Sequence, residues 1–219
     1  MIVNERITDY LDSLSTRNSD LTEEIRKKAV SDRVPVIRRD SEALLKTVIA
    51  MVRPREVLEI GTGVAYSALV MKESIPEGSH ITTVEDYPPR MEKAAENIRL
   101  SHAEDCITLI REDAGNVIPG LEEESFDLIF LDAAKGQYAS WLPHLLKCLK
   151  QNGVLFSDNV LQNGSVTESR FAIDRRDRTI HSRMREYLYL LTHTEGLCTS
   201  VVPTGDGTAI SVKGMRNHE

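Results

Sequence analysis

Residues 59–67 of this 219-residue chain read Glu59-Ile60-Gly61-Thr62-Gly63-Val64-Ala65-Tyr66-Ser67. An apolar run precedes the two glycines and a helical pattern follows them, so the stretch predicts a strand that turns directly into a helix. Glycines at the carboxyl end of a strand let the backbone approach a ligand closely, in the crevice where open α/β sheets bind small molecules. A tight turn can also require them for structural reasons alone. An NAD-binding fingerprint would place a third glycine at position 66, where this chain has Tyr66.

The sequence on both sides of this stretch alternates between apolar runs and helical patterns. Five apolar runs predict strands at Val57–Ile60, Ile81–Val84, Ile107–Ile110, Phe126–Leu131 and Val154–Phe156. Helical patterns are expected near 4–16, 20–32, 40–52, 65–75, 89–101, 137–150 and 176–194. Strands and helices that alternate in this order indicate a mostly parallel sheet with helices on both faces.

The C-terminal part departs from this alternation. Two β-rich runs, Cys198–Val202 and Thr208–Val212, are joined by a turn that contains Asp206-Gly207, a strong signal for a hairpin. A mostly parallel seven-stranded sheet that ends in an antiparallel hairpin is typical of Rossmann-like class I methyltransferases that use S-adenosylmethionine (SAM). We therefore expect one α/β domain over residues 1–219, with N-terminal helices in 1–52 and the α/β core in 53–219.

The composition is that of a globular protein. Hydrophobic residues make up 41% and charged residues 28% of the chain, which is too apolar for a disordered protein. No uncharged apolar run approaches the roughly 20 residues of a membrane helix, so we expect no membrane partner. Three widely spaced cysteines and an N-terminus without a signal-peptide core predict a cytoplasmic protein. The net charge of −7 argues against indiscriminate binding of nucleic acid, although it is compatible with a local basic patch.

Acidic residues follow the second and third predicted strands. Glu85 ends the second strand, where a carboxylate can accept hydrogen bonds from both hydroxyls of a cofactor ribose. Asp113-Ala114 follow the third strand at the same edge of the sheet. Glu85 by itself could be a solvated strand end, but the third contact at this edge favours a cofactor site.

The fourth and fifth predicted strands end in groups that suit a metal. Asp132 follows the fourth strand, and Asp158 and Asn159 follow the fifth. Because neighbouring parallel strands end at the same edge, these side chains are expected to converge. Two carboxylates and an amide oxygen form a hard donor set that suits Mg²⁺ and leaves positions open for water and substrate. Either aspartate alone could merely cap the next helix.

Lys135 lies close to Asp132 in the sequence and could serve the same chemistry. A metal lowers the pKa of a bound hydroxyl, and Lys135 could take the proton or stabilise the oxyanion. The alternative is a surface lysine that balances the charge of the acidic cluster. Asp132 and Lys135 are the expected catalytic residues.

Four motifs resemble those of the metal-dependent O-methyltransferase family that includes catechol and caffeoyl-CoA O-methyltransferases. They occur in the family's order along nearly the whole chain: E-I-G-T-x-x-x-Y-S, D-A-A-K-x-x-Y, D-N-V-L-x-x-G and P-x-G-D-G-x-x-I-S. The resemblance implies metal ligation by Asp132, Asp158 and Asn159. It implies SAM contacts at Ile37, Gly61, Ser67, Glu85, Asp113, Ala114 and Asp132. Ala65 departs from the pattern, because many members have glycine there.

Within this family, the chain is most similar to bacterial tRNA 5-hydroxyuridine methyltransferases. The likeness lies in the short N-terminus, the motif at 132–138 and an arginine-rich segment after Asn159. It implies methylation of the 5-hydroxyl of wobble 5-hydroxyuridine to 5-methoxyuridine, with the tRNA anticodon stem-loop as partner, and a homodimer. Clustered arginines are the footprint of phosphate contacts, and the expected RNA contacts are Arg170, Arg175, Arg176 and Arg178.

Three alternatives are left open by the sequence. Asp174, Asp177 and Glu186 are interspersed with the arginines, so the segment could be a solvated helix face. A small catechol-like or hydroxylated aromatic acceptor would suit the same metal site, since the 5-hydroxyl and O4 of 5-hydroxyuridine form a similar chelating pair. The chain could also be a non-catalytic nucleotide-binding module, but the intact acidic cluster and Lys135 argue against that reading.

Overall fold

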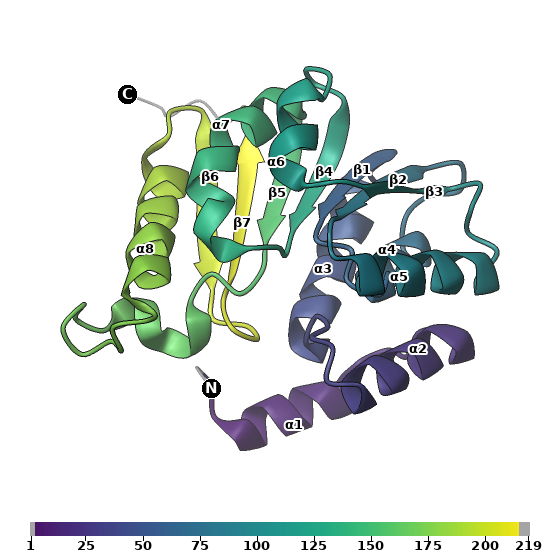
Figure 1. Cartoon of the computed structure of the whole chain (residues 1–219), viewed down its shortest axis with the longest axis horizontal. Helices are drawn as coiled ribbons and strands as arrows, with labels where there is room; N and C mark the ends of the chain where they lie inside the picture. Colours follow the sequence, from purple (N-terminus) through teal and green to yellow (C-terminus); the bar gives the residue numbers. More distant parts are fainter. Residues whose placement is uncertain (1–2, 215–219) are drawn as a thin grey trace.

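The computed structural model describes residues 3–214 and contains a seven-stranded sheet with the order β3-β2-β1-β4-β5-β7-β6 (Figure 1). The strands are β1 (Glu56–Ile60), β2 (His80–Glu85), β3 (Ile107–Arg111), β4 (Phe126–Leu131), β5 (Leu149–Ser157), β6 (Leu197–Val202) and β7 (Thr208–Lys213). Strands β1 to β5 pair in parallel, whereas β7 is antiparallel to both β5 and β6. The C-terminal hairpin therefore joins the sheet through its second strand.

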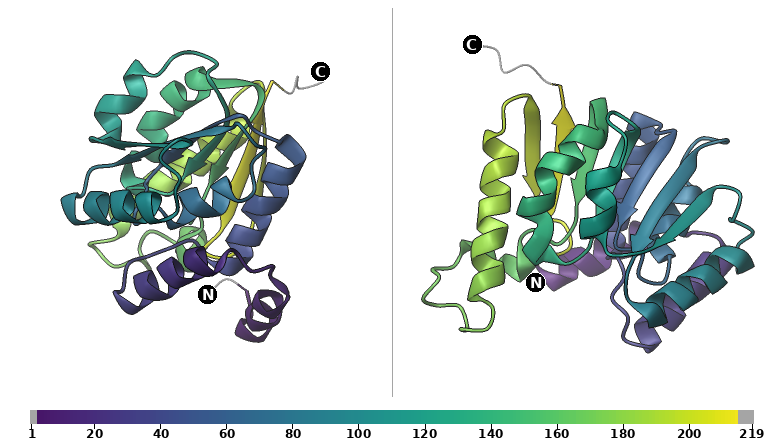
Figure 2. Two further views of the ribbon diagram at one scale, coloured as in Figure 1. Left: turned by 90° about the vertical axis from the view of Figure 1, so that its right-hand side faces the viewer. Right: turned by 45° about the horizontal axis from the view of Figure 1, so that its top comes forward.

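Helices cover both faces of the sheet (Figure 2). The α-helices are α1 (Glu5–Leu14), α2 (Asp20–Ser31), α3 (Arg39–Val52), α4 (Tyr66–Lys72), α5 (Pro88–Leu100), α6 (Ala114–Val117), α7 (Tyr138–Cys148) and α8 (Arg178–His193). Short 3₁₀ helices are η1 (Ile118–Gly120), η2 (Lys135–Gln137) and η3 (Gln162–Thr167). Leu128 of β4 packs in one core cluster with α2 to α5, and its neighbour Ile129 packs in the other with α7 and α8. The sheet is therefore buried on both faces, as the apolar runs require.

A buried polar cluster ties the N-terminal helices to the start of α4. The Arg39 guanidinium pairs with Glu23 of α2 and Glu42 of α3, and it donates to the Tyr66 hydroxyl at 3.2 Å. That hydroxyl donates to Glu42 at 2.5 Å. The hydrogen bond from Arg39 is the main reason that the pKa of Glu23 falls to about 2. Because Tyr66 directly follows the glycine turn, the N-terminal helices help to fix that turn.

The predicted fold is confirmed, with shifts at some boundaries. Strand β5 begins at Leu149, where the sequence pattern predicts the end of a helix, and α8 begins at Arg178. Helix α6 was not predicted, because four residues are too few to show a helical period. No helix in residues 3–214 is long and apolar enough to cross a membrane. The predicted domain limits, 1 and 219, lie outside the described residues.

Ala65 adopts the left-handed conformation that glycine favours. Its φ is 66° and its ψ is 19°, and its side chain is fully buried at the N-terminus of α4. A residue with a Cβ atom loses about 1–2 kcal/mol in this region of backbone space. The backbone at position 65 therefore favours glycine, and this chain tolerates the strain of an alanine there.

Ala65→Gly should change the free energy of unfolding by less than about 1 kcal/mol. Relief of backbone strain offsets the larger conformational entropy that glycine gives the unfolded chain. The matched control Ala68→Gly removes an equally buried methyl group from inside α4 and should destabilise by about 1–2 kcal/mol. Urea denaturation measures both variants. An equal loss in the two would contradict this account of Ala65.

Candidate active site

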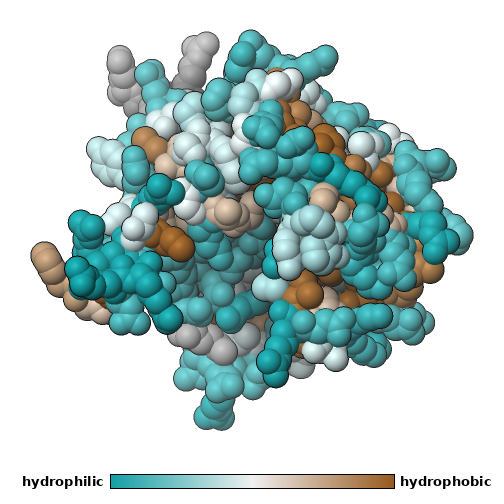
Figure 3. All heavy atoms as spheres, in the orientation of Figure 1, coloured by the Kyte–Doolittle hydropathy of each residue, from teal (hydrophilic) through white to brown (hydrophobic). Residues whose placement is uncertain are grey.

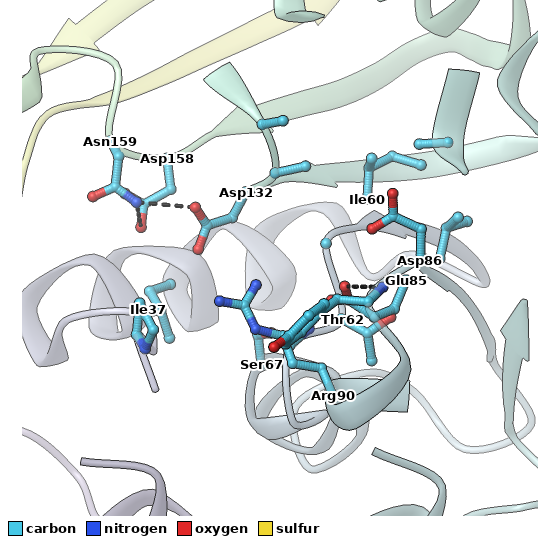
Figure 4. Close-up of a pocket in the computed structure, with 18 of the residues that line it drawn as sticks. Ile37, Ile60, Thr62, Ser67, Glu85, Asp86, Arg90, Asp132, Asp158 and Asn159 are labelled. Carbon is cyan, nitrogen blue, oxygen red and sulfur yellow. Dashed lines mark hydrogen bonds between the residues drawn. The ribbon is translucent and has the colours of Figure 1, made fainter. Parts of the chain in front are cut away.

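A cleft of about 670 Å³ lies at the carboxyl ends of the parallel strands. The strand order reverses there between β1 and β4, and such switch points are where open α/β sheets bind ligands. Figure 4 shows Asp132 and Asp158 on one side of this cleft and Glu85 on the other. The structure brings together all the residues expected for cofactor, metal and catalysis, namely Ile37, Gly61, Ser67, Glu85, Asp113, Ala114, Asp132, Lys135, Asp158 and Asn159.

The two glycines of the turn have different roles. Gly61 has a φ of +100°, and a Cβ atom there would lie 2.8 Å from the carbonyl carbon of Asp132, so only glycine fits. Gly63 has a φ of +55°, but a Cβ atom there would meet nothing within 4 Å. Gly63 also lines the cleft. The fold therefore requires Gly61, whereas Gly63 leaves open space that a ligand can occupy.

Backbone groups of the turn fix the orientation of Glu85. Its carboxylate accepts the N–H of Gly63 at 2.8 Å and the N–H of Tyr87 at 3.1 Å. The side chain is buried, yet it lines the cleft. A carboxylate has about four acceptor positions, so Glu85 can still accept hydrogen bonds from two ligand hydroxyls.

A second buried carboxylate lies behind the turn. Glu59 accepts hydrogen bonds from the hydroxyls of Ser67 and Thr83, the latter at 2.5 Å. Burial raises the pKa of Glu59 to about 8, although both hydrogen bonds act in the opposite direction. The sequence pattern did not single out Glu59; the available signal was an acid in the middle of an otherwise apolar strand. Glu59 orients the Ser67 hydroxyl at the wall of the cleft.

Asp113 and Ala114 line the cleft beside Trp141, the one tryptophan of the chain. Asp113 caps α6, because its Oδ1 atom accepts the N–H of Gly115 at 2.6 Å. Trp141 was not predicted as a site residue, since an aromatic residue in a helical pattern is more often part of the core. Its place in the cleft provides a flat apolar surface and a natural fluorescent probe.

Asp132, Asp158 and Asn159 converge as expected. The Asn159 side-chain amide donates to Asp132 at 3.0 Å and to Asp158 at 3.4 Å (Figure 4). Thr208 of β7 donates to Asp158 at 3.1 Å. Burial, followed by the nearby charge of Asp132, raises the pKa of Asp158 to about 7. Burial also raises the pKa of Asp132. Ionisation of the two carboxyl groups in this cluster is therefore unfavourable.

This donor set fits a divalent cation. A cation neutralises crowded, desolvated carboxylates, and oxygen atoms are the ligands that Mg²⁺ prefers. The cluster contains only two acidic side chains, and within residues 3–214 there is no group of three or more His, Cys, Asp or Glu side chains that could hold a metal. The protein thus offers two carboxylates and one amide, which leaves coordination positions for water and an acceptor.

Charged side chains surround the acidic pair. Burial has the largest effect on the pKa of Asp132 and raises it. The positive charge of Lys135 has the second largest effect and lowers this pKa. The charge of Arg90 in α5 also lowers the pKa of Asp132, and the charge of Asp206 raises it. Asp206 is itself paired with Arg38 at 2.9 Å. Arg38, Arg90 and Asp206 line the cleft and were not among the predicted site residues.

The arginine-rich segment does not line the cleft. It forms the loop between η3 and α8, which projects from the body of the molecule at the lower left of Figure 1. Arg170, Arg175 and Arg176 are exposed. Arg178, the first residue of α8, is half-buried, and its Nε atom donates to the Ile173 carbonyl of the loop at 3.0 Å. Of the four predicted RNA contacts, three are therefore exposed and Arg178 is half-buried.

Asp158→Asn should stabilise the metal-free protein at pH 8 by roughly 1–3 kcal/mol. The folded-state pKa of Asp158 is raised from 3.8 to about 7, so the wild-type protein loses stability as pH rises through this range. Asparagine can still accept the Thr208 hydrogen bond and carries no charge. Urea denaturation in chelator measures the gain, which should disappear below about pH 4.

Asp105→Asn is the control, because Asp105 is exposed outside the cleft and its replacement should leave stability nearly unchanged. A loss of stability in Asp158→Asn at pH 8 would show that the acidic pair is a structural element.

Comparisons with known sequences give the same family. The chain matches the O-methyltransferase family model over residues 12–214. A caffeoyl-CoA O-methyltransferase of Stellaria longipes is 27% identical over 175 residues, which are 76% of this chain and 73% of the relative. A catechol O-methyltransferase of Niastella koreensis is 27% identical over 127 residues, which are 57% of this chain and 58% of the relative.

Solved structures share the fold. A Staphylococcus aureus protein described as a candidate caffeoyl-CoA O-methyltransferase has a TM-score of 0.88 and 30% identity, covering 96% of this chain and 100% of its own. The methyltransferase PaMTH1 of Podospora anserina, solved with bound SAH, has a TM-score of 0.86 and 24% identity, covering 96% and 97%. The chain belongs to the O-methyltransferase family.

Proposed function

We propose that the protein transfers the methyl group of SAM to a hydroxyl oxygen in a reaction that depends on Mg²⁺. One observation carries this proposal: a single cleft holds the pre-oriented Glu85 carboxylate at one end, and the half-buried Asp132 beside the buried Asp158 at the other. Membership of the O-methyltransferase family supports transfer to oxygen.

The residues that would hold SAM differ in their chemistry. Glu85 offers acceptors for the ribose hydroxyls, and Gly63 leaves room for the ligand beside its backbone. The indole of Trp141 provides a surface for a planar base near Asp113 and Ala114. The other expected contacts are Ile37, Gly61, Ser67 and Asp132.

Asp132, Asp158 and Asn159 would hold Mg²⁺ through their oxygen atoms. The ion, when bound, lowers the pKa of an acceptor hydroxyl. The Thr208 hydroxyl fixes how Asp158 points. The Asn159 amide, whose Nδ2 atom donates to both carboxylates in this structure, would turn over to present its oxygen to the ion. Lys135, half-buried beside this pair, would accept the hydroxyl proton or balance the negative charge that develops on the oxygen.

We propose 5-hydroxyuridine at the wobble position of tRNA as the acceptor and 5-methoxyuridine as the product. Charged residues such as Lys135 and Asp206 lie around the acidic pair, together with the apolar Ala133 and Ala134, whereas Trp141 lies beside Asp113 at the expected cofactor end. The exposed Arg175 and Arg176 would neutralise phosphates of the anticodon stem-loop.

A small hydroxylated aromatic acceptor is the second candidate. The names of the related catechol and caffeoyl-CoA enzymes favour it. Both acceptors present adjacent oxygen atoms to the same metal site, so only substrate assays distinguish them. Methylation of free catechols, with no activity on tRNA from cells that lack the protein, would establish this alternative.

SAM should change the fluorescence of Trp141, whereas NAD should not. Glu85→Gln should weaken SAM binding by about 1.5–3 kcal/mol, because it removes charge-assisted hydrogen bonds to the ribose. Glu77→Gln, in the exposed turn before β2, is the control and should bind SAM as wild type does. Fluorescence titration and calorimetry give the affinities. Tight NAD binding without SAM binding would overturn the cofactor assignment.

Lys135→Met should lower the turnover number about 100-fold, while the affinities for SAM and Mg²⁺ stay within about twofold of wild type. A loss of about 100-fold is at the low end of what a general base contributes, because the metal already acidifies the hydroxyl. Lys147→Met removes a surface lysine paired with Glu123 and serves as the control. Steady-state kinetics with and without chelator test both variants. A loss below threefold would assign Lys135 to charge balance, and full activity in chelator would exclude metal dependence.

The double variant Arg175→Gln and Arg176→Gln should raise the KM for tRNA about tenfold. Each lost phosphate contact should also reduce the log–log salt slope by about 0.7–0.9, because fewer counterions are released. The control double variant Arg53→Gln and Arg99→Gln removes two exposed arginines from other elements. Equal KM values in the two double variants would remove the arginine loop from the RNA interface.

A further inference from the structure

Phe171 projects into solvent from the arginine-rich loop. Its side chain is 88% exposed, more than any other large hydrophobic side chain in the described part of the chain. Figure 3 shows a projection on the left in which strongly hydrophilic atoms lie beside a hydrophobic tip. The fold gains almost no burial from this phenylalanine, so its bearing on a partner comes from the groups beside it in the loop.

The loop that carries Phe171 is anchored on both sides of it. Before Phe171, the Glu168 carbonyl lies 3.2 Å from the Nε2 atom of the buried His181 in α8. After it, the Ile173 carbonyl accepts the Nε–H of Arg178 at 3.0 Å. The aromatic ring is therefore presented from a short segment with fixed ends.

The ends of this segment lead to elements beside the acceptor side of the cleft. At one end it continues from η3, which follows Asn159 closely in the chain. At the other end it leads into α8, where Arg183 donates to the Gly136 carbonyl at 2.9 Å, directly beside Lys135. A polynucleotide whose reacting base enters the cleft would have neighbouring nucleotides close to this loop.

We propose that Phe171 stacks on an unpaired base of the anticodon loop next to the methylated nucleotide. This inference rests on the proposed tRNA function. Proteins recognise single-stranded RNA loops by stacking splayed bases on aromatic rings while arginines neutralise the backbone. Phe171 lies between the exposed Arg170 and the exposed pair Arg175 and Arg176, which is the combination that such a loop requires.

The test compares Phe171→Ala with Phe171→Trp, on tRNA and on an anticodon stem-loop that carries 2-aminopurine next to the wobble position. Phe171→Ala should raise the KM for tRNA about tenfold and abolish the fluorescence quenching by stacking, and Phe171→Trp should retain both. Tyr189→Ala removes another exposed aromatic ring, which stacks on His193 of the same helix, and should behave as wild type.

The possible failures are distinguishable. If wild type methylates tRNA but Phe171→Ala keeps its KM and quenching, the stacking role is wrong and the proposed function stands. If wild type neither binds the stem-loop nor methylates tRNA, both proposals fall together. Methylation of the free 5-hydroxyuridine nucleoside should be equal in all variants, because Phe171 does not line the cleft.

Tyr138 carries a second, independent inference. Its fully buried hydroxyl accepts the N–H of Ala133 at 3.0 Å and donates to the Leu131 carbonyl at 3.3 Å, so it binds both neighbours of Asp132. The Leu131 carbonyl also accepts the N–H of Asp158 at 3.0 Å. We infer that Tyr138 is a positioning residue, whose hydroxyl sets the direction of Asp132 and links it to the backbone of Asp158.

Calorimetry with Mg²⁺ alone tests this role in Tyr138→Phe, which keeps the ring and loses the hydroxyl. Mg²⁺ affinity should fall about tenfold while SAM affinity stays within twofold. Tyr187→Phe is the matched control, since its buried ring packs 5.2 Å from that of Tyr138 but its hydroxyl bonds to the Ser157 side chain. Mg²⁺ affinity within twofold of wild type in Tyr138→Phe would overturn the inference.

Discussion

Two neighbouring carboxylates, the half-buried Asp132 and the buried Asp158, share one amide donor, and the functional architecture depends on this arrangement. The parallel register that pairs Leu131 of β4 with Ser157 of β5 places the next residue of each strand side by side. Burial and mutual repulsion oppose ionisation of both groups, and the Asn159 amide compensates only in part. Without a counter-charge the pair opposes folding at neutral pH, and this cost is the observation that favours a bound cation.

The same division between fold and function recurs in the cofactor turn. Gly61 is required because its backbone packs against the end of β4, and any side chain there would collide with Asp132. Gly63 has no such neighbour, and its N–H holds Glu85 at the wall of the cleft. The fold therefore requires Gly61, whereas the open space beside Gly63 is available to a ligand.

Sequence periodicity was sufficient to predict the sheet, the layers and the convergence of Asp132 with Asp158, because parallel strands end at one edge. It could not reveal Trp141 or Tyr138, since the direction of a helical side chain toward a cleft depends on how the helix packs. The hydrogen bond from Arg178 Nε to the Ile173 carbonyl also has no local signal in the sequence. The metal site does not distinguish the two candidate acceptors, because both present adjacent oxygen atoms to it.

The most direct test of the central claim is Mn²⁺ electron paramagnetic resonance of the wild-type protein and of Asp132→Asn and Asp158→Asn. We expect one tightly bound Mn²⁺ per wild-type chain, lost in each variant while SAM still binds to Asp158→Asn. Adding the acceptor should alter the wild-type spectrum, because open coordination positions face it. Equal Mn²⁺ binding in wild type and both variants would contradict the claim that this pair forms the metal site.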